Sequence, residues 1–314
     1  MRALGVVGEG LVELGVEPPP DVEVTLGFGG DAPNAAVMAA LLGVPARIAG
    51  RVGDDALGRR LLAFWRSAGV DVAHVVVDPG APTGIYVNER GAEGLQRFDY
   101  HRAGSAGSRL APADLGPAFH DGLGVLHVTG ITLAVSQSSS EAALAAVERA
   151  RAAGSRISVA ANHRPALGGD PARIAELASR AHVVFVSEEE AGAVFGASEP
   201  SLIAAALPGV EELVVTRGAD GCLVRHAGTE TARPVFQVEV VDAAGAGDAL
   251  AGAYLAARLA GASPEAALEV GAVAAALSCR ARGCARSYPA RAELQAACGG
   301  LPWQAREQST GGGR

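Results

Sequence analysis

The chain has 314 residues, of which 49% are apolar and 19% are charged. This balance predicts one large folded core rather than a disordered chain. All 26 of its Lys and Arg residues are arginines, because the sequence contains no lysine. The lack of lysine excludes P-loop nucleotide hydrolases, protein kinases and Schiff-base enzymes, whose chemistry needs a lysine amine.

The formal net charge is −8, which argues against nucleic acid and anionic membrane surfaces as partners and favours a small-molecule ligand. The N-terminal segment reaches a charged residue too soon for a signal peptide, and no apolar run has the ~18 residues of a membrane helix. We therefore expect a cytoplasmic protein. Four cysteines follow no metal-binding spacing and are expected to be free thiols in a reducing compartment. They are Cys222, Cys279, Cys284 and Cys298.

The first hundred residues mix strands, helices and turn-rich segments. Apolar and alternating patterns predict strands at 3–8, 22–26 and 46–50, and buried or amphipathic patterns predict helices at 34–43 and 55–68. Between 72 and 102 the pattern becomes one of short alternating segments joined by turns, at 72–77, 84–88 and 95–100. These segments predict antiparallel pairing inside an otherwise βα chain.

From residue 124 onward, strands and helices alternate. The expected strands are 125–129, 156–160, 182–187 and 211–216, and the expected helices are 140–153, 171–179 and 188–195. This rhythm predicts an α/β fold with a mostly parallel sheet and helices on both faces. A hairpin-like region over 221–240, an apolar strand at 235–241 and two Ala-rich helices at 246–260 and 264–280 follow. The tail, 301–314, is expected to be disordered.

A run of small residues, Asp242-Ala-Ala-Gly-Ala-Gly-Asp248, stands at the start of the first Ala-rich helix. Small side chains leave backbone N–H groups bare at a helix N-terminus, where the helix dipole also favours a phosphate. We expect Gly245, Ala246 and Gly247 to form an anion site and Asp248 to accept a proton from an attacking hydroxyl. The structural alternative is a tight turn followed by an acidic helix start.

Two more glycine-centred stretches follow predicted strands, Gly29-Gly30-Asp31-Ala-Pro-Asn34 and Thr216-Arg217-Gly218-Ala-Asp-Gly221. Ligands of α/β sheets lie at the carboxyl ends of strands, which is where both stretches fall. The sequence from Gly29 to Asn34 and the run from Asp242 to Asp248 resemble the two signatures of the ribokinase-type (PfkB) carbohydrate kinases. The resemblance extends over about residues 3–298, with the signatures in the family's order.

This resemblance implies a ribokinase-like kinase domain over residues 1–300. Its core would comprise 1–9, 28–82 and 104–300, and a small antiparallel β lid would comprise about 10–27 and 83–103. The family pattern makes Asp248 the catalytic base and assigns Gly30, Asp31 and Asn34 to the sugar. It assigns ATP to Ser187, Thr216, Arg217, Gly218 and Gly221 and places Glu190 on Mg²⁺ through water. For Glu190 the structural alternative is a solvated acidic helix start.

Within the family, the chain most resembles kinases of 2-keto-3-deoxygluconate. The resemblance rests on Tyr86, on Tyr100 and Arg102 in one run, and on Arg164 two residues after Asn162. Two arginines in one pocket suit a sugar acid, because a carboxylate accepts paired hydrogen bonds from a guanidinium. The alternatives are structural ion pairs for the arginines and lid packing or a dimer contact for the tyrosines.

The chain also departs from the pattern at two positions. Ala160 and Cys284 stand where the resemblance suggests acidic residues, and each change removes a group that could bind a sugar hydroxyl or the metal shell. We therefore expect ATP-dependent phosphorylation of a primary hydroxyl on 2-keto-3-deoxygluconate, with a neutral sugar such as fructose or ribose, or a nucleoside, as the alternative. A non-catalytic sugar or nucleotide sensor is a third possibility. The edges of the lid sheet could also pair two chains in a homodimer.

Overall fold

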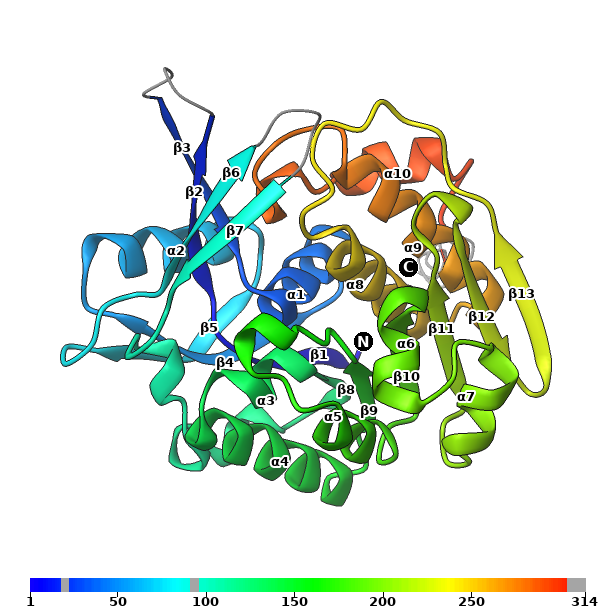
Figure 1. The fold of residues 1–314 in the computed structure, drawn as a ribbon, viewed down its shortest axis with the longest axis horizontal. Coiled ribbons are helices and arrows are strands. Elements are labelled where there is room, and N and C mark those ends of the chain that lie inside the picture. Colours follow the sequence, from blue (N-terminus) through cyan, green and yellow to red (C-terminus); the bar gives the residue numbers. More distant parts are fainter. Residues whose placement is uncertain (18–22, 91–95, 304–314) are drawn as a thin grey trace, which may run out of the picture.

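A nine-stranded sheet forms the centre of the molecule in the computed structural model, which describes residues 1–17, 23–90 and 96–303 (Figure 1). The strand order is β13-β12-β11-β10-β9-β8-β1-β4-β5. All neighbours pair in parallel except at one edge, where β11, β12 and β13 are antiparallel. The strands are β1 (Ala3–Val7), β4 (Ala46–Gly53), β5 (Asp71–Asp78), β8 (Leu123–Thr129), β9 (Arg156–Ala160), β10 (Val183–Ser187), β11 (Glu212–Thr216), β12 (Cys222–His226) and β13 (Thr229–Arg233).

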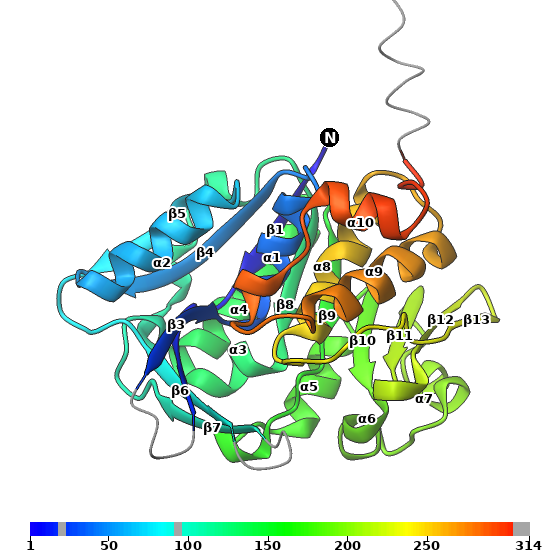
Figure 2. The same ribbon diagram turned by 90° about the horizontal axis from the view of Figure 1, so that it is seen from above.

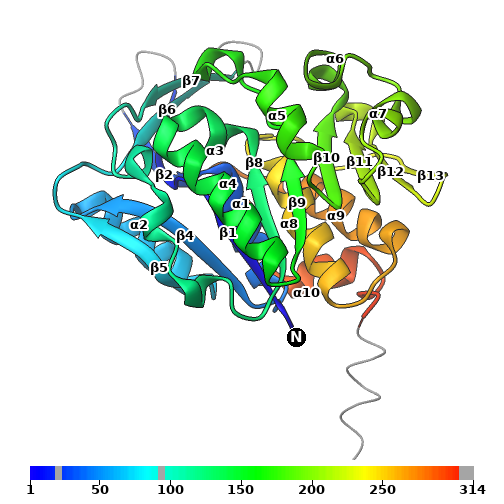
Figure 3. The same cartoon turned by 90° about the horizontal axis from the view of Figure 1, so that it is seen from below.

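Helices cover both faces of this sheet, as the alternation of elements predicts (Figure 3). The helices that pack into one hydrophobic cluster are α1 (Asp31–Leu41), α2 (Ala56–Ser67), α8 (Ala246–Leu259), α9 (Pro264–Ser278) and α10 (Arg291–Ala297). Those that pack into the cluster on the opposite face are α3 (Gly130–Val135), α4 (Gln137–Ala152), α5 (Pro171–Ala178), α6 (Glu188–Phe195) and α7 (Pro200–Ala206). Because both faces are covered, the inner strands are mainly apolar, and even the polar side chains of His127, Thr129 and Ser158 are buried.

A second sheet of four strands stands beside the core (Figures 1 and 2). Its order is β3-β2-β6-β7, with β2 (Leu11–Val16), β3 (Val24–Gly29), β6 (Ile85–Arg90) and β7 (Gln96–His101). The outer pairs are antiparallel, whereas the central pair of β2 and β6 is parallel. These strands lie in the segments predicted for the lid, except that β3 continues two residues past the expected boundary at 27.

Several elements differ from the sequence prediction. The predicted strand at 235–241 is wrong: this stretch is extended coil, and its apolar side chains line a cavity instead of pairing in a sheet. The helices α3, α7 and α10 had no counterpart in the prediction. The strand predicted at 72–77 was expected to pair antiparallel, but as β5 it pairs in parallel with β4 in the core sheet. Leu301 and Trp303, at the start of the expected disordered tail, are buried in the core. Residues 304–314 of that tail lie outside the described residues, as do Val22 and Leu95 of two predicted strands.

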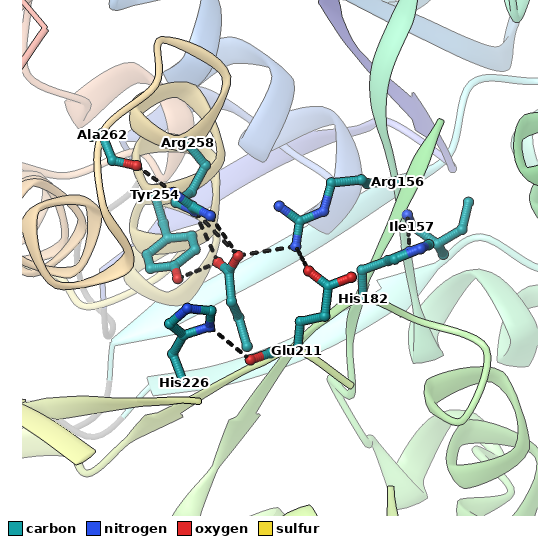
Figure 4. Close-up of polar contacts among 9 residues, drawn as sticks. Arg156, Ile157, His182, Glu211, His226, Tyr254, Arg258 and Ala262 are labelled. Atoms are coloured by element: carbon teal, nitrogen blue, oxygen red, sulfur yellow. Dashed lines mark hydrogen bonds and ion pairs between the residues drawn. The ribbon is translucent and has the colours of Figure 1, made fainter. Parts of the chain in front are cut away.

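The end of α8 remote from the loop at Gly245, here called the anion loop, is tied to the core sheet by a buried carboxylate (Figure 4). Glu212, the first residue of β11, is fully buried and accepts hydrogen bonds from Tyr254 at 2.5 Å and Arg258 at 2.8 Å, both on α8. Arg156, at the start of β9, donates to the same carboxylate at 3.0 Å. These charged hydrogen bonds hold the pKa of Glu212 below its usual range despite the opposing effect of burial.

In the residues that the structure describes, no helix has the length and apolar content needed to cross a bilayer. All four cysteines are free thiols.

Candidate active site

The predicted site residues gather at the carboxyl edge of the core sheet. Asp31 opens α1, Glu190 lies in the first turn of α6 directly after β10, Thr216 ends β11, and Asp248 lies in the first turn of α8. Parallel strands present their carboxyl ends along one edge. Of the three helices, α6 begins there directly after a core strand, whereas α1 follows β3 of the smaller sheet and α8 follows the irregular segment 234–245. This placement brings together residues more than two hundred positions apart in the sequence.

The N-termini of α1 and α8 meet at the predicted catalytic base. Asn34 donates a hydrogen bond from Nδ2 to Oδ2 of Asp248 at 2.8 Å. The helices can approach this closely because Gly252 has no side chain: a Cβ there would lie 2.4 Å from the carbonyl oxygen of Ala35. Gly252 therefore sets the distance between the two helices that carry Asn34 and Asp248.

Asp248 shares its surroundings with a second carboxylate, Asp31. Asp31 accepts hydrogen bonds from the hydroxyl of Thr129 and, at 3.5 Å, from Nδ2 of Asn162. Withdrawal from water and the nearby Asp31 charge raise the pKa of Asp248 to about 7, although the Asn34 hydrogen bond and Arg164 oppose this shift. A carboxylate with a pKa in this range is well matched to accepting a proton near neutral pH.

The glycine-rich loop before α8 presents free backbone amides, but not all those expected. Gly245 caps the helix in the left-handed conformation, with φ +79°. The N–H of Ala246 donates back to the carbonyl of Ala243 at 3.2 Å, so the assignment of the Ala246 amide to the anion site does not hold in this structure. Among the described residues, the amides of Gly247 and Asp248 have no acceptor, and they point from a helix N-terminus that favours an anion.

An apolar cavity of about 550 Å³ adjoins this loop. Of the predicted nucleotide-binding residues, Thr216, Gly218 and Gly221 line it, and Gly247 lines its end beside α8. Arg217 and Ser187 are not in its lining. The cavity is covered on one side by the coil at 234–240, whose side chains include Phe236. It has the size and apolar character of a small-molecule site.

Glu190 forms a capping box at the start of α6. One carboxylate oxygen accepts the N–H of Ser187 at 2.8 Å, and the other accepts the N–H of His163 at 2.6 Å, while the Ser187 hydroxyl accepts the N–H of Glu190 at 3.3 Å. Glu190 is only 9% exposed. The structural alternative, a solvated acidic helix start, is therefore wrong, because the carboxylate joins α6 to the segment after β9.

The two lid tyrosines lie side by side across β6 and β7. Tyr86 and Tyr100 are paired in register, with ring centroids 5.8 Å apart. Tyr86 is buried and packs over Gly29, where a Cβ would lie 2.7 Å from its hydroxyl. Tyr100 is 39% exposed. Burial is the main cause that raises the pKa of both phenols, so both remain neutral hydrogen-bonding groups.

Arg102 is already engaged by an acidic residue that the sequence prediction did not assign. Its Nε donates to Glu9 at 2.8 Å, its Nη2 lies 2.5 Å from the same carboxylate oxygen, and its guanidinium lies over the ring of Tyr100. Ser105 donates to the other oxygen of Glu9. Burial raises the pKa of Glu9, with Arg102 and Ser105 offsetting part of that shift. In this structure Arg102 therefore forms a structural ion pair and is not free to bind a substrate carboxylate.

Arg164 differs from Arg102 in being exposed and unpaired. Within the described part of the chain it forms no ion pair, and its guanidinium donates one hydrogen bond, to the neighbouring carbonyl of His163 at 3.1 Å. Its positive charge opposes the rise in the pKa of both Tyr100 and Asp248 that burial causes. Arg164 is therefore the available cation on this side of the site.

The arrangement of free amides, a carboxylate base and an adjoining cavity has a match among known families. Residues 10–291 match the model of the pfkB family of carbohydrate kinases. The chain belongs to this family. It is a sugar kinase, as the two glycine-rich signatures predicted.

This kinase has curated relatives that act on several sugars. It is 35% identical to the 2-dehydro-3-deoxygluconokinase of Thermoproteus tenax, over 94% of each chain. It is 35% identical to fructokinase-1 of Oryza sativa, over 72% of each chain. The first of these names denotes the kinase of 2-keto-3-deoxygluconate, which is the same compound.

Solved structures confirm the predicted ribokinase-like fold of this kinase. A PfkB protein from Polaromonas sp. superposes with a TM-score of 0.83 at 30% identity, with 95% of this chain and all of that chain covered. A protein assigned as ribokinase II from E. coli, in complex with ATP and Mg²⁺, superposes with a TM-score of 0.86 at 25% identity, with 95% and 99% covered.

Sequence reasoning missed several residues of this kinase's site. Glu9 follows Gly8 directly after β1, and Thr129 is the last residue of β8, so both occupy the strand-end positions that could have identified them. Tyr288 gives no such signal, because its contact with the anion loop depends on a turn after α9. The two departures also lie in the interior: Ala160 ends β9, and Cys284 accepts a hydrogen bond from Asn34 at 3.2 Å.

Proposed function

We propose that this kinase transfers the γ-phosphoryl group of ATP to a primary hydroxyl of a sugar acid, with 2-keto-3-deoxygluconate as the substrate. The observation that carries the choice of an acid is Arg164, an exposed guanidinium that has no carboxylate partner in the described residues and stands two positions after Asn162, which bonds to Asp31 beside the base. A substrate carboxylate would complete this pair. The name of the Thermoproteus tenax relative supports the same substrate.

In this mechanism Asp248 takes the proton of the attacking hydroxyl as the phosphoryl group moves. Asn34 holds the base through the 2.8 Å hydrogen bond to Oδ2. The amides of Gly247 and Asp248 face the developing negative charge on the phosphoryl oxygens. Gly30, Asp31, Tyr86 and Tyr100 would surround the sugar, since they line the junction of α1 and the lid.

ATP is assigned to the cavity beside Gly247. Its volume of about 550 Å³ suits a nucleotide, and its apolar lining suits the flat face of a base. Arg217 does not line this cavity, so its predicted contact with the phosphates would require a change of side-chain position. The complex of the E. coli protein with ATP and Mg²⁺ supports ATP as the nucleotide.

Mg²⁺ fits the residues present only through water. No group of three or more His, Cys, Asp or Glu in the described residues could cage a metal, and both oxygens of Glu190 already accept one backbone N–H each. Each carboxylate oxygen retains a second lone pair, so Glu190 can accept a metal-bound water. Mg²⁺ commonly keeps several waters and takes its other ligands from substrate phosphates, whose charge it neutralises.

A neutral sugar is the second candidate substrate. The engagement of Arg102 by Glu9 removes one of the two cations that favoured an acid, and Cys284 and Ala160 leave fewer acidic groups in the site. The 35% identity to a rice fructokinase supports this alternative.

The deciding experiment measures ADP release with ATP and Mg²⁺ against 2-keto-3-deoxygluconate, gluconate, fructose, ribose and adenosine, beside the Asp248→Asn variant. Turnover of the keto acid, reduced at least a thousandfold in the variant, is the expected result. Turnover of fructose or ribose alone would overturn the sugar-acid assignment while retaining Asp248 as the base. Tight sugar binding with no turnover of any substrate would favour the sensor instead.

We also propose that two chains pair through their lids in the cytoplasm. The face of the lid opposite Tyr86 carries Leu14, Val16 and Val24, none of them buried, and Val24 is 57% exposed. Burial of this apolar patch against the lid of a second chain would stabilise a dimer. Light scattering should give the mass of a dimer for the native chain and that of a monomer for Val24→Arg, and a native monomer would contradict the proposal.

The four free thiols support a reducing compartment.

A further inference from the structure

A turn after α9 packs directly behind the anion loop. From this turn, Tyr288 donates a hydrogen bond from its hydroxyl to the carbonyl of Gly245 at 2.8 Å. Tyr288 is 7% exposed, and burial holds its pKa well above the usual range, so the phenol stays a neutral donor. None of the site residues predicted from the sequence makes this hydrogen bond to the carbonyl of Gly245.

The carbonyl of Gly245 has a second partner within the helix. It accepts the N–H of Ala249 at 2.9 Å, which is the first regular hydrogen bond of α8. A carbonyl that already has one partner does not need another to avoid the cost of an unsatisfied buried group. The hydrogen bond from Tyr288 therefore acts mainly on orientation. Because both lone pairs of the Gly245 carbonyl oxygen are engaged, the peptide between Gly245 and Ala246 is held in one orientation.

Steric contacts reinforce this orientation. A Cβ at Gly245 would lie 2.6 Å from Sγ of Cys284 and 2.9 Å from the hydroxyl of Tyr288. The loop thus passes against the turn without space to shift toward it. The next residues along the loop, Gly247 and Asp248, carry the amides that have no acceptor, and their direction follows from the orientation of the peptide that precedes them.

We propose that Tyr288 is a positioning residue for phosphoryl transfer, which holds the carbonyl of Gly245 and thereby aims the amides of Gly247 and Asp248 at the transferring group. The inference rests on the proposed function and deepens it. Donors fixed in advance around developing charge contribute mainly to the transition state, because they need no rearrangement during the reaction. Loss of the Tyr288 hydroxyl should thus lower kcat much more than it weakens the binding of ATP or sugar.

The test compares Tyr288→Phe with Tyr254→Phe in the full chain. Both changes delete one buried hydroxyl, but Tyr254 bonds to Glu212 at the other end of α8. For Tyr288→Phe we expect kcat to fall about 10- to 100-fold, corresponding to about 1.4–2.7 kcal/mol of transition-state stabilisation, with KM for ATP and sugar within threefold of the native values. For Tyr254→Phe we expect a lower melting temperature and a native kcat when assayed below that temperature.

A binding measurement makes the test independent of the sugar. The affinity of the protein for Mg·ADP with aluminium fluoride, which mimics the transferring phosphoryl group, should fall at least tenfold in Tyr288→Phe, whereas the affinity for Mg·ADP alone stays within threefold. A native affinity for the fluoride complex, or equal losses in both tyrosine variants, would overturn the inference. If the native chain turned over no sugar, the proposed function would fail, yet this comparison would still decide the role of Tyr288.

Discussion

At the scale of single residues, the chemistry of Asp248 depends on its neighbour Asp31. Burial and the Asp31 carboxylate raise the pKa of Asp248 to about 7, so the base is protonated below that pH. We expect kcat/KM to fall about tenfold per pH unit below 7. The Asp31→Asn variant lacks the like charge, so the acidic limb of its pH–rate profile, where kcat/KM falls with falling pH, should move to lower pH. A limb that stays in place would contradict the contribution of Asp31.

The same shift has a consequence for stability. The folded-state pKa of Asp248 is above the ordinary aspartate value of 3.8, so the folded state holds this proton more tightly than the unfolded chain. Its contribution to folding is full below pH 3.8 and is lost as the pH rises toward 7. The Asp248→Asn variant should therefore have a higher melting temperature than the native chain at pH 8. Near pH 4 the melting temperatures of the two should be equal. Calorimetry at the two pH values checks this sign.

The two arginines of the predicted sugar-acid pocket should respond differently to substitution. Arg102→Ala leaves the buried carboxylate of Glu9 without its cation, which should reduce the free energy of unfolding by about 3–5 kcal/mol. Arg164→Ala breaks no ion pair and should instead raise KM for a sugar acid about tenfold or more, with little change for fructose. Chemical denaturation and substrate titration of both variants separate these roles. Equal stability losses in both would contradict the assignment.

At the scale of elements, the close packing of α1 on α8 sets the position of the base. Gly252→Val would push its side chain into the carbonyl of Ala35 and the side chain of Met38, so the helices must separate. We expect a stability loss of about 1–3 kcal/mol together with a lower kcat, because Asn34 then loses its 2.8 Å contact with Asp248. Gly116→Ala, at a position with open space around it, is the control. Native activity in Gly252→Val would contradict this account.

The elements also show which parts of the molecule can be inferred from sequence. The βα alternation from residue 124 is local, and it predicted the parallel sheet and the strand ends at which Thr216 and Glu190 lie. The apolar residues at 235–241 predicted a strand, yet this stretch is a coil that lines a cavity with consecutive residues from Pro234 to Val238. The pairing of Arg102 with Glu9 spans 93 residues, and neither periodicity nor spacing encodes a contact between such distant segments.

At the scale of the whole molecule, the lid and the anion loop are joined through one buried carboxylate. Gln96, the first residue of β7, donates to Oδ1 of Asp242 at 2.7 Å, and the same oxygen accepts the N–H of Ala244 at 2.9 Å. Asp242 is only 4% exposed. The position of the lid is thus linked to the segment that leads into Gly245, so a lid closed over the sugar would also steady the loop that receives the phosphoryl group.

This link should couple ATP use to the presence of sugar. Closure of a lid excludes water, which would otherwise accept the phosphoryl group. Gln96→Ala should therefore raise the ratio of ADP released to sugar phosphate formed above the value of one expected for the native kinase, and raise KM for the sugar. Arg97→Ala, whose side chain pairs with Asp99 on the exposed face of the same strand, should leave the ratio unchanged. If Gln96→Ala kept a ratio of one, the lid would close without help from Asp242, and the hydrogen bond would only fasten β7 to the core.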